Sequence, residues 1–229
     1  MTPKNERLAQ LFLRYASPLS GLRRVPILGP FVSWAADKIV SHDSLTWVQI
    51  QQGPAAGLWL RLNPRTGHAA FEGAGEPEVQ RALVQHLRPG MNFYDIGANI
   101  GFFTLLGARL VGEKRRVTSL EADPEIAARL REHVARNHFS QATVEEKAVW
   151  SQQTVVKFSR SDPNVSPDRG LGHVARTHIA STPIASTDVA STNVARTKDA
   201  STNETSCIEV QAVSLDEYTS AFPAPDFLT

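Results

Sequence analysis

Phe93-Tyr94-Asp95-Ile96-Gly97-Ala98-Asn99-Ile100-Gly101-Phe102-Phe103 joins a short apolar run to a helical pattern through a turn that holds two glycines. Residues 91–96 lie between Pro89-Gly90 and Gly97, which is typical of a short buried parallel strand. Residues 101–111 have the spacing of an amphipathic helix, which stops at Gly112. The sequence therefore predicts a strand, a turn and a helix in the arrangement of a nucleotide-type cofactor loop.

The two glycines have a mechanical role in this turn. Gly97 can adopt backbone dihedrals that are closed to other residues, and Gly101 removes a side chain where a ligand or the strand would collide with it. The N–H groups that open the helix should be free and face the carboxyl end of the strand, where the helix dipole favours a negative group. We expect the anionic end of a small molecule there.

A second acidic position follows the next predicted strand. Residues 117–120 form an apolar run that leads into Glu121, and Asp123 and Pro124 then read as the N-cap and first residue of another helix. An acidic residue at the end of the second strand of a β-α-β unit can accept hydrogen bonds from both hydroxyls of a ribose. Glu121 is the strongest single ligand candidate.

The glycine spacing distinguishes two classes of cofactor. Dinucleotide binding needs G-x-G-x-x-G, but Asn99 stands where the second glycine would let the backbone approach a pyrophosphate. The ligand is therefore expected to lack phosphates. S-adenosylmethionine has none, and its methionine carboxylate suits a helix N-terminus.

Several further motifs follow one another in a definite order. They are Glu76-Pro77-Glu78-Val79, Arg88-Pro89-Gly90, the run YDIGANIGFFTLLGARLVG at 94–112, the set Glu121, Asp123 and Pro124, and Val213-Ser214-Leu215-Asp216-Glu217-Tyr218. With these motifs the chain resembles the FkbM-type S-adenosylmethionine-dependent methyltransferases, a branch of the seven-stranded class I fold. The resemblance covers roughly residues 45–228.

The resemblance implies an α/β, Rossmann-like class I methyltransferase fold and transfer of a sulfonium methyl group, usually to a hydroxyl oxygen. It implies that Asp95, Gly97, Ala98, Asn99 and Gly101 line the methionine and ribose end of the cofactor, with Glu121 on the ribose. A sugar, lipid or natural product would be the acceptor, so the partner is a small molecule or glycan. The cofactor carries the chemistry, and the protein positions the acceptor oxygen.

Simpler interpretations of the same residues stay open. Asp95 could cap the following turn, and Gly97 and Gly101 could serve only close helix–strand packing. Glu121 could be a charge at a helix start that the dipole stabilises. Phe102 and Phe103 are expected in the core.

Composition agrees with an α/β protein that has one sizeable core, because 41% of the 229 residues are hydrophobic. A formal net charge of +1 favours neither a nucleic-acid nor an anionic-membrane partner. The single cysteine, Cys207, excludes an intrachain disulfide, so a cytoplasmic location is expected. No apolar run is long enough for a membrane span, and a signal peptide is not expected. The histidine spacings indicate no metal site.

We expect three parts along the chain. Residues 1–44 form an accessory helical segment, packed on the domain or lying on a membrane surface. Residues 45–90 hold a strand hairpin over 45–71, with Gly53-Pro54 near its turn, and a helix over 76–87. Residues 91–229 form the S-adenosylmethionine-binding domain.

Within that domain, residues 142–149 are expected as the third strand of the sheet, and 155–158 as an extra strand that pairs with 208–213. The family resemblance makes Lys147 and Ala148, near the end of the third strand, candidates to reach an adenine.

A five-residue repeat in six copies fills an insert at about 173–206, beginning Ala175-Arg-Thr-His-Ile. Its period matches neither helix nor strand, and its Ser, Thr and Ala content cannot offset the entropy of ordering, so we expect a disordered loop. His173, at the start of this insert, is a candidate general base for a hydroxyl proton, because imidazole titrates near neutrality, although an exposed loop histidine is the simpler interpretation.

Residues 224–228 resemble the opening of the fourth strand of the family's sheet, so the C-terminal part of the sheet is expected to be missing. Two alternatives to an active methyltransferase follow: a truncated, non-catalytic remnant, and, if a nicotinamide binds instead, an oxidoreductase. The sequence leaves the methyl acceptor and the oligomeric state unknown.

Overall fold

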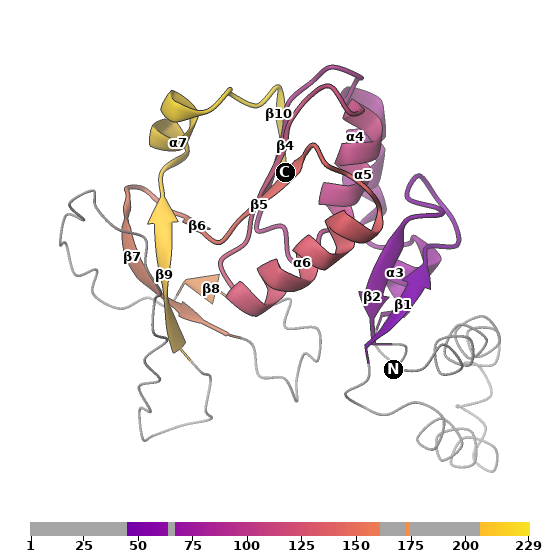
Figure 1. Cartoon of the computed structure of the whole chain (residues 1–229), viewed down its shortest axis with the longest axis horizontal. Coiled ribbons are helices and arrows are strands. Elements are labelled where there is room, and N and C mark those ends of the chain that lie inside the picture. Colours follow the sequence, from indigo (N-terminus) through magenta and orange to yellow (C-terminus); the bar gives the residue numbers. More distant parts are fainter. Residues whose placement is uncertain (1–44, 64–66, 161–172, 175–206) are drawn as a thin grey trace, which may run out of the picture. The chain divides into compact units, whose positions relative to one another are not determined.

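A computed structural model describes residues 45–63, 67–160, 173–174 and 207–229 (Figure 1). These residues belong to two compact units, which divide between Glu76 and Pro77. The accessory segment expected at 1–44 and the pentapeptide repeat lie outside the described residues.

The first unit contains a two-stranded antiparallel hairpin. Strands β1 (Thr46–Gln49) and β2 (Trp59–Leu62) pair from Thr46 opposite Leu62 to Gln49 opposite Trp59, as the alternating pattern predicted. Gly53 lies in the connection with a positive φ of 76°. Val48, Leu60 and Leu62 are fully buried or nearly so.

The hairpin expected over 45–71 is too long. Residues after 66 form a short helix, α3 (His68–Glu72), that ends at the left-handed Gly73. Strand alternation stops at Leu62, and His68-Ala69-Ala70-Phe71 has no period of two. Phe71 is buried, and its carbonyl accepts a 2.9 Å hydrogen bond from the Gln51 amide, which holds the helix against the hairpin.

The second unit is built on a four-stranded parallel sheet. Strands β3 (Phe93–Ile96), β4 (Val117–Leu120), β5 (Ala142–Glu145) and β10 (Phe227–Leu228) lie in the order β10-β3-β4-β5. The strand predicted within 224–228 is present as β10, and Phe227 pairs with Phe93 in parallel, which places β10 beside β3. Parallel strands need crossover helices, which place helices on the faces of the sheet.

Helices cover both faces of this sheet. On one face, α4 (Pro77–His86) and α5 (Phe102–Val111) pack a core on alternate residues of the strands, with Leu83, Leu106, Phe93 and Val117 buried. On the other face, α7 (Leu215–Ala221) brings Tyr218 against Tyr94 and Leu120. The helices expected over 76–87 and 101–111 are confirmed, and α4 belongs to the sheet unit rather than to the hairpin.

A second sheet has the order β6-β9-β7-β8, with β6 (Ala148–Val149), β7 (Thr154–Ser159), β8 (His173–Val174) and β9 (Cys207–Val213). The predicted pairing of 155–158 with 208–213 is confirmed, because β7 and β9 are antiparallel neighbours (Figure 1). The prediction of a single strand over 142–149 is wrong. It divides into β5 in the first sheet and β6 in the second, which pairs in parallel with β9.

Helix α6 (Pro124–Arg136) follows β4 and lies beside α5. Asp123 is its N-cap and Pro124 its first residue, as predicted. The two helices approach closely at Gly101, the N-cap of α5, because a Cβ placed there would lie 1.9 Å from Leu130 Cδ1. Gly101 also has a φ of +85°. The close contact at Gly101 is therefore between two helices, whereas the simpler interpretation from the sequence was helix–strand packing.

Gly97 and Gly101 should respond differently to substitution. Gly97 has a φ of +67° but nothing within 4 Å of its added Cβ, so Gly97→Ala should cost only the left-handed strain of about 1–2 kcal/mol. Gly101→Ala adds overpacking against Leu130 and should cost about 2–5 kcal/mol. Urea unfolding of both variants measures the difference. Equal losses would contradict the helix-packing role of Gly101.

Candidate functional site

The turn after β3 is held by its own backbone. Its five consecutive N–H groups, from Gly97 to Gly101, all donate hydrogen bonds within the chain. Gly97 and Ala98 donate to the Leu120 carbonyl at 2.9 and 3.1 Å, Asn99 to Glu121 Oε2 at 2.7 Å, Ile100 to Asn99 Oδ1 at 2.7 Å, and Gly101 to the Ala98 carbonyl at 2.8 Å.

The amides of the turn itself are therefore not free, while free N–H groups in the first turn of α5, from Phe102 onward, stay a prediction. The Gly101 amide, at the N-cap, already has an acceptor, and so do the four amides before it. Asn99 takes up a left-handed conformation with a φ of 50°, which asparagine tolerates better than most residues. The turn is therefore pre-shaped rather than open, and an anion would have to meet the helix further along its first turn.

Glu121 joins the ends of two strands. It follows β4, is 8% exposed, and accepts hydrogen bonds from the Asn99 amide at 2.7 Å and the Asp123 amide at 2.8 Å, one on each carboxylate oxygen. Its own amide donates to the Glu145 carbonyl at the end of β5. The residue is thus anchored between the glycine turn and the cap of α6, which a solvated helix-start charge would not be.

The ionisation of Glu121 reflects this burial. Burial raises the pKa of its carboxyl above the ordinary value, and the neighbouring Asp123 charge acts in the same direction, while hydrogen bonds from the amides of Asp123, Asn99 and Ala122 lower it. The net effect is a raised pKa. The carboxylate is thus a buried acid held by one backbone donor from the glycine turn and one from the cap of α6, which makes it a candidate for a functional site.

Asp95 lies deeper than the turn. It is 3% exposed, and its carboxylate accepts hydrogen bonds from Thr104 Oγ1 at 2.5 Å and Thr229 Oγ1 at 3.1 Å. Thr104 of α5 also lies 2.8 Å from Ser119 Oγ of β4. Asp95 therefore ties its own strand to the helix and to the neighbouring strand.

His133 is a residue of the site that sequence reasoning missed. It is fully buried in α6, and its Nδ1 lies 2.7 Å from the carbonyl oxygen of Ile100 in the glycine turn. The available signal was its place three residues after Leu130 on the apolar face of the helix. From the sequence, a histidine on that face is expected to be a core residue. Only the position of α6 in the structure shows that His133 reaches the glycine turn.

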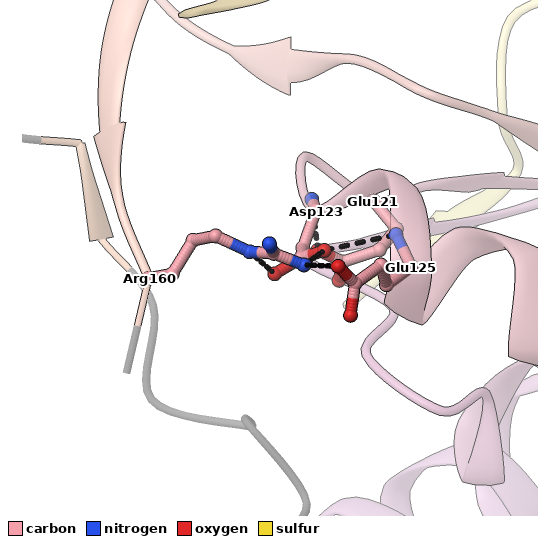
Figure 2. A network of polar contacts seen from close by, with 4 residues as sticks. All are labelled: Glu121, Asp123, Glu125 and Arg160. Atoms are coloured by element: carbon pink, nitrogen blue, oxygen red, sulfur yellow. Dashed lines mark hydrogen bonds and ion pairs between the residues drawn. The ribbon is translucent and has the colours of Figure 1, made fainter. Parts of the chain in front are cut away.

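Arg160 is the second missed residue. It follows β7, and its guanidinium makes two hydrogen bonds to the Asp123 carboxylate, Nε to Oδ2 at 2.6 Å and Nη2 to Oδ1 at 2.7 Å. Nη2 also lies 3.0 Å from Glu125 Oε1. Figure 2 shows these side chains beside Glu121. Burial lowers the pKa of Arg160, but the hydrogen bonds and charges of the two acids outweigh it and raise the pKa above its ordinary value.

The structure brings together most of the residues proposed from the sequence. Asp95, Gly97, Ala98, Asn99, Gly101 and Glu121 all lie at the carboxyl ends of β3 and β4. Lys147 forms an ion pair with Glu145 at 3.2 Å and lies 5.4 Å from the centre of the Tyr218 ring, while Ala148 is buried in the core of the second sheet. An adenine contact by either residue stays a prediction.

His173 lies in β8 opposite Ser159, the residue before Arg160. The role of a general base stays a prediction.

Within the described part of the chain, no group of three or more His, Cys, Asp and Glu residues could hold a metal ion. Among the same residues, no helix is both long and apolar enough to cross a bilayer.

A parallel sheet with a glycine turn after its first strand and an acidic residue after its second defines a Rossmann-like site for a nucleoside-containing cofactor. A profile of the methyltransferase FkbM domain matches residues 95–229, more than half of the chain. The chain therefore belongs to the FkbM methyltransferase family. This membership supports S-adenosylmethionine as its cofactor.

Solved methyltransferases are similar to part of the chain. An Aquifex aeolicus SAM-dependent methyltransferase is 23% identical, with a TM-score of 0.30, over 36% of this chain and 42% of its own. TYW2 of M. jannaschii, in complex with AdoMet, is 18% identical, with a TM-score of 0.35, over 44% of this chain and 42% of its own. The chain thus spans less than half of either structure. A search of curated proteins found no significant match.

The Asp95 contacts can be tested with two threonines. Thr104→Val keeps the shape but removes the donor to a buried carboxylate, and should cost about 1.5–3 kcal/mol of unfolding free energy. Thr118 of β4 is the matched control. It is 1% exposed, and its hydroxyl has no hydrogen-bond partner among the described residues.

Thr118→Val should therefore leave the free energy of unfolding unchanged or raise it, because it removes a buried hydroxyl that no hydrogen bond compensates. Urea unfolding reports both values. A Thr104→Val protein as stable as the Thr118→Val protein would refute the structural role given to the Asp95–Thr104 bond.

Proposed function

We propose that this chain binds S-adenosylmethionine at the carboxyl ends of β3 and β4 and supports methyl transfer to a hydroxyl oxygen. The observation that carries the proposal is the Glu121 carboxylate, held by the Asn99 and Asp123 amides at the end of the second strand of the unit. Membership of the FkbM methyltransferase family supports the reaction class. The acceptor is a small molecule or glycan, and a hydroxyl on a sugar, lipid or natural product fits it.

Glu121 has the capacity to hold a ribose in this arrangement. A carboxylate offers about four acceptor positions, so its bonds to backbone amides leave room for a hydroxyl donor. The amides also fix the carboxylate before any ligand arrives, and a pre-organised group loses little entropy on binding. The role of Glu121 follows from both properties.

Gly97 supports the same placement of the ligand. It is exposed, and a Cβ added to it would meet nothing within 4 Å, so the backbone has open space beside it. Because the turn amides already have acceptors, we assign the methionine carboxylate to the first turn of α5 after Gly101. The helix dipole favours a negative group there.

The bound cofactor would supply the electrophilic methyl group. The chain's own residues orient it: Glu121 at the ribose, the glycine turn and α5 at the methionine end, and Asp95 beneath them as a link between strand and helix. His173 is the candidate to remove the hydroxyl proton. General bases of this kind contribute about 10²–10⁴-fold to a rate.

Calorimetric titration tests the cofactor directly. Folded chain should bind S-adenosylmethionine and S-adenosylhomocysteine, and should not bind NAD. Glu121→Ala should weaken binding of both by about 1.5–3 kcal/mol, the range for hydrogen bonds to a charged group. An absence of heat from folded wild-type protein would favour the non-catalytic remnant, and heat with NAD would favour an oxidoreductase. Unchanged affinity in Glu121→Ala would remove Glu121 from the ribose.

The raised pKa of Glu121 gives a pH dependence with a definite sign. Only the ionised carboxylate accepts on both oxygens, so affinity for S-adenosylhomocysteine should fall as the pH falls through this pKa. Because burial raises the pKa, the loss should begin above the ordinary value of 4.5. Glu121→Gln cannot titrate and should bind weakly with little change between about pH 5 and 8. The same pH profile in both proteins would show that another group titrates.

A further inference from the structure

Arg160 links the second sheet to the loop that follows β4 of the first sheet. It follows β7, which pairs with β9, and it makes an ion pair with the residue that caps α6. The pair is well shielded, since the side chains of Arg160 and Asp123 are 11% and 3% exposed. A bidentate contact of this kind fixes direction as well as distance.

The contact continues from Asp123 to Glu121. Asp123 uses its side chain for Arg160 and for the Glu125 amide, at 2.9 Å, while its own amide donates to Glu121 Oε1 at 2.8 Å. The other Glu121 oxygen accepts from Asn99 in the glycine turn. Hydrogen bonds joined through the residues Asp123 and Glu121 therefore connect the second sheet to the turn after β3.

Charge gives the same pair a second effect. Glu121, Asp123 and Glu125 place three acidic groups within five residues of chain, and the first two are buried. Arg160 contacts the second and third of these acids and offsets part of their charge (Figure 2). Without this cation, an ionised Asp123 would be left buried without its counter-charge, and such a group tends to move or to neutralise.

We propose that Arg160 is a positioning residue of the cofactor site: through its bidentate bond to Asp123, it places the Glu121 carboxylate for the ribose hydroxyls. Arg160 itself does not touch the cofactor in this proposal. Its side chain acts on Glu121 indirectly: it fixes Asp123, and the Asp123 amide donates to the Glu121 carboxylate. The inference rests on the proposed binding of S-adenosylmethionine.

The test measures how well the site recognises one ribose hydroxyl. The full chain is titrated with S-adenosylhomocysteine and with its 2′-deoxy analogue, and the ratio of the two dissociation constants is the readout. In the wild-type protein the ratio should be about tenfold or more, as for a hydroxyl that binds a charged group. In Glu121→Ala it should approach one.

Arg160→Met should lower this ratio to about threefold or less, because a displaced Glu121 no longer distinguishes the two ligands. Arg131→Met is the matched control: it also removes an arginine that pairs with an acid, Glu146, but from the exposed side of α6. It should keep the wild-type ratio. A purely structural effect of Arg160 would weaken both ligands equally and leave the ratio unchanged.

The outcomes separate the two proposals. If wild-type protein binds neither ligand, the proposed cofactor site fails. If wild-type protein discriminates and Arg160→Met discriminates equally well, the positioning role is overturned. If Arg160→Met does not fold, Arg160→Lys takes its place. Lysine keeps the charge but loses the bidentate geometry, so a ratio between those of wild type and Glu121→Ala supports the role, and a wild-type ratio overturns it.

Discussion

The buried carboxylate of Glu121 is the constraint on which the rest of the site depends. It accepts one hydrogen bond from an amide of the turn after β3 and one from an amide at the cap of α6. Two loops that follow different strands are therefore held by the same carboxylate. Burial of a charge is costly unless hydrogen bonds compensate for it. The amides of Asn99 and Asp123 supply that compensation, and in doing so they hold the turn in shape. The same group is the one proposed to bind the ribose.

The two sheets of the second unit make different contacts with the segment that carries this carboxylate. The parallel sheet supplies the turn and the strand ends, and it buries its faces under α4 and α5 on one side and α7 on the other. The second sheet packs Ala122, the residue between Glu121 and Asp123, into its core. It also reaches Asp123 through Arg160. The short segment from Glu121 to Asp123 is thus held from both sheets.

Local patterns in the sequence were sufficient for much of this arrangement. The periodicities of 91–96, 101–111 and 117–120, and the capping pair Asp123-Pro124, predicted elements that the structure confirms, because each depends on neighbours in the chain. The division of 142–149 between two sheets was not visible, since the sequence of a strand does not state which strand it will pair with. Helix α3 was not predicted from the sequence, because a helix of five residues is too short to show a periodic pattern.

The sequence by itself determined the class of the protein: a glycine turn, an acidic residue after the second strand and the order of the flanking motifs establish the family, since these are spacings along one chain. Only the tertiary structure decided how the site is held. His133 and Arg160 are distant in sequence from the turn and carry no motif. His133 reaches the turn because α6 lies against the residues that precede α5, and Arg160 reaches Asp123 because β7 ends beside it. The sequence also did not show which acceptors the turn amides bond to, because hydrogen-bond partners are set by three-dimensional proximity and not by spacing along the chain.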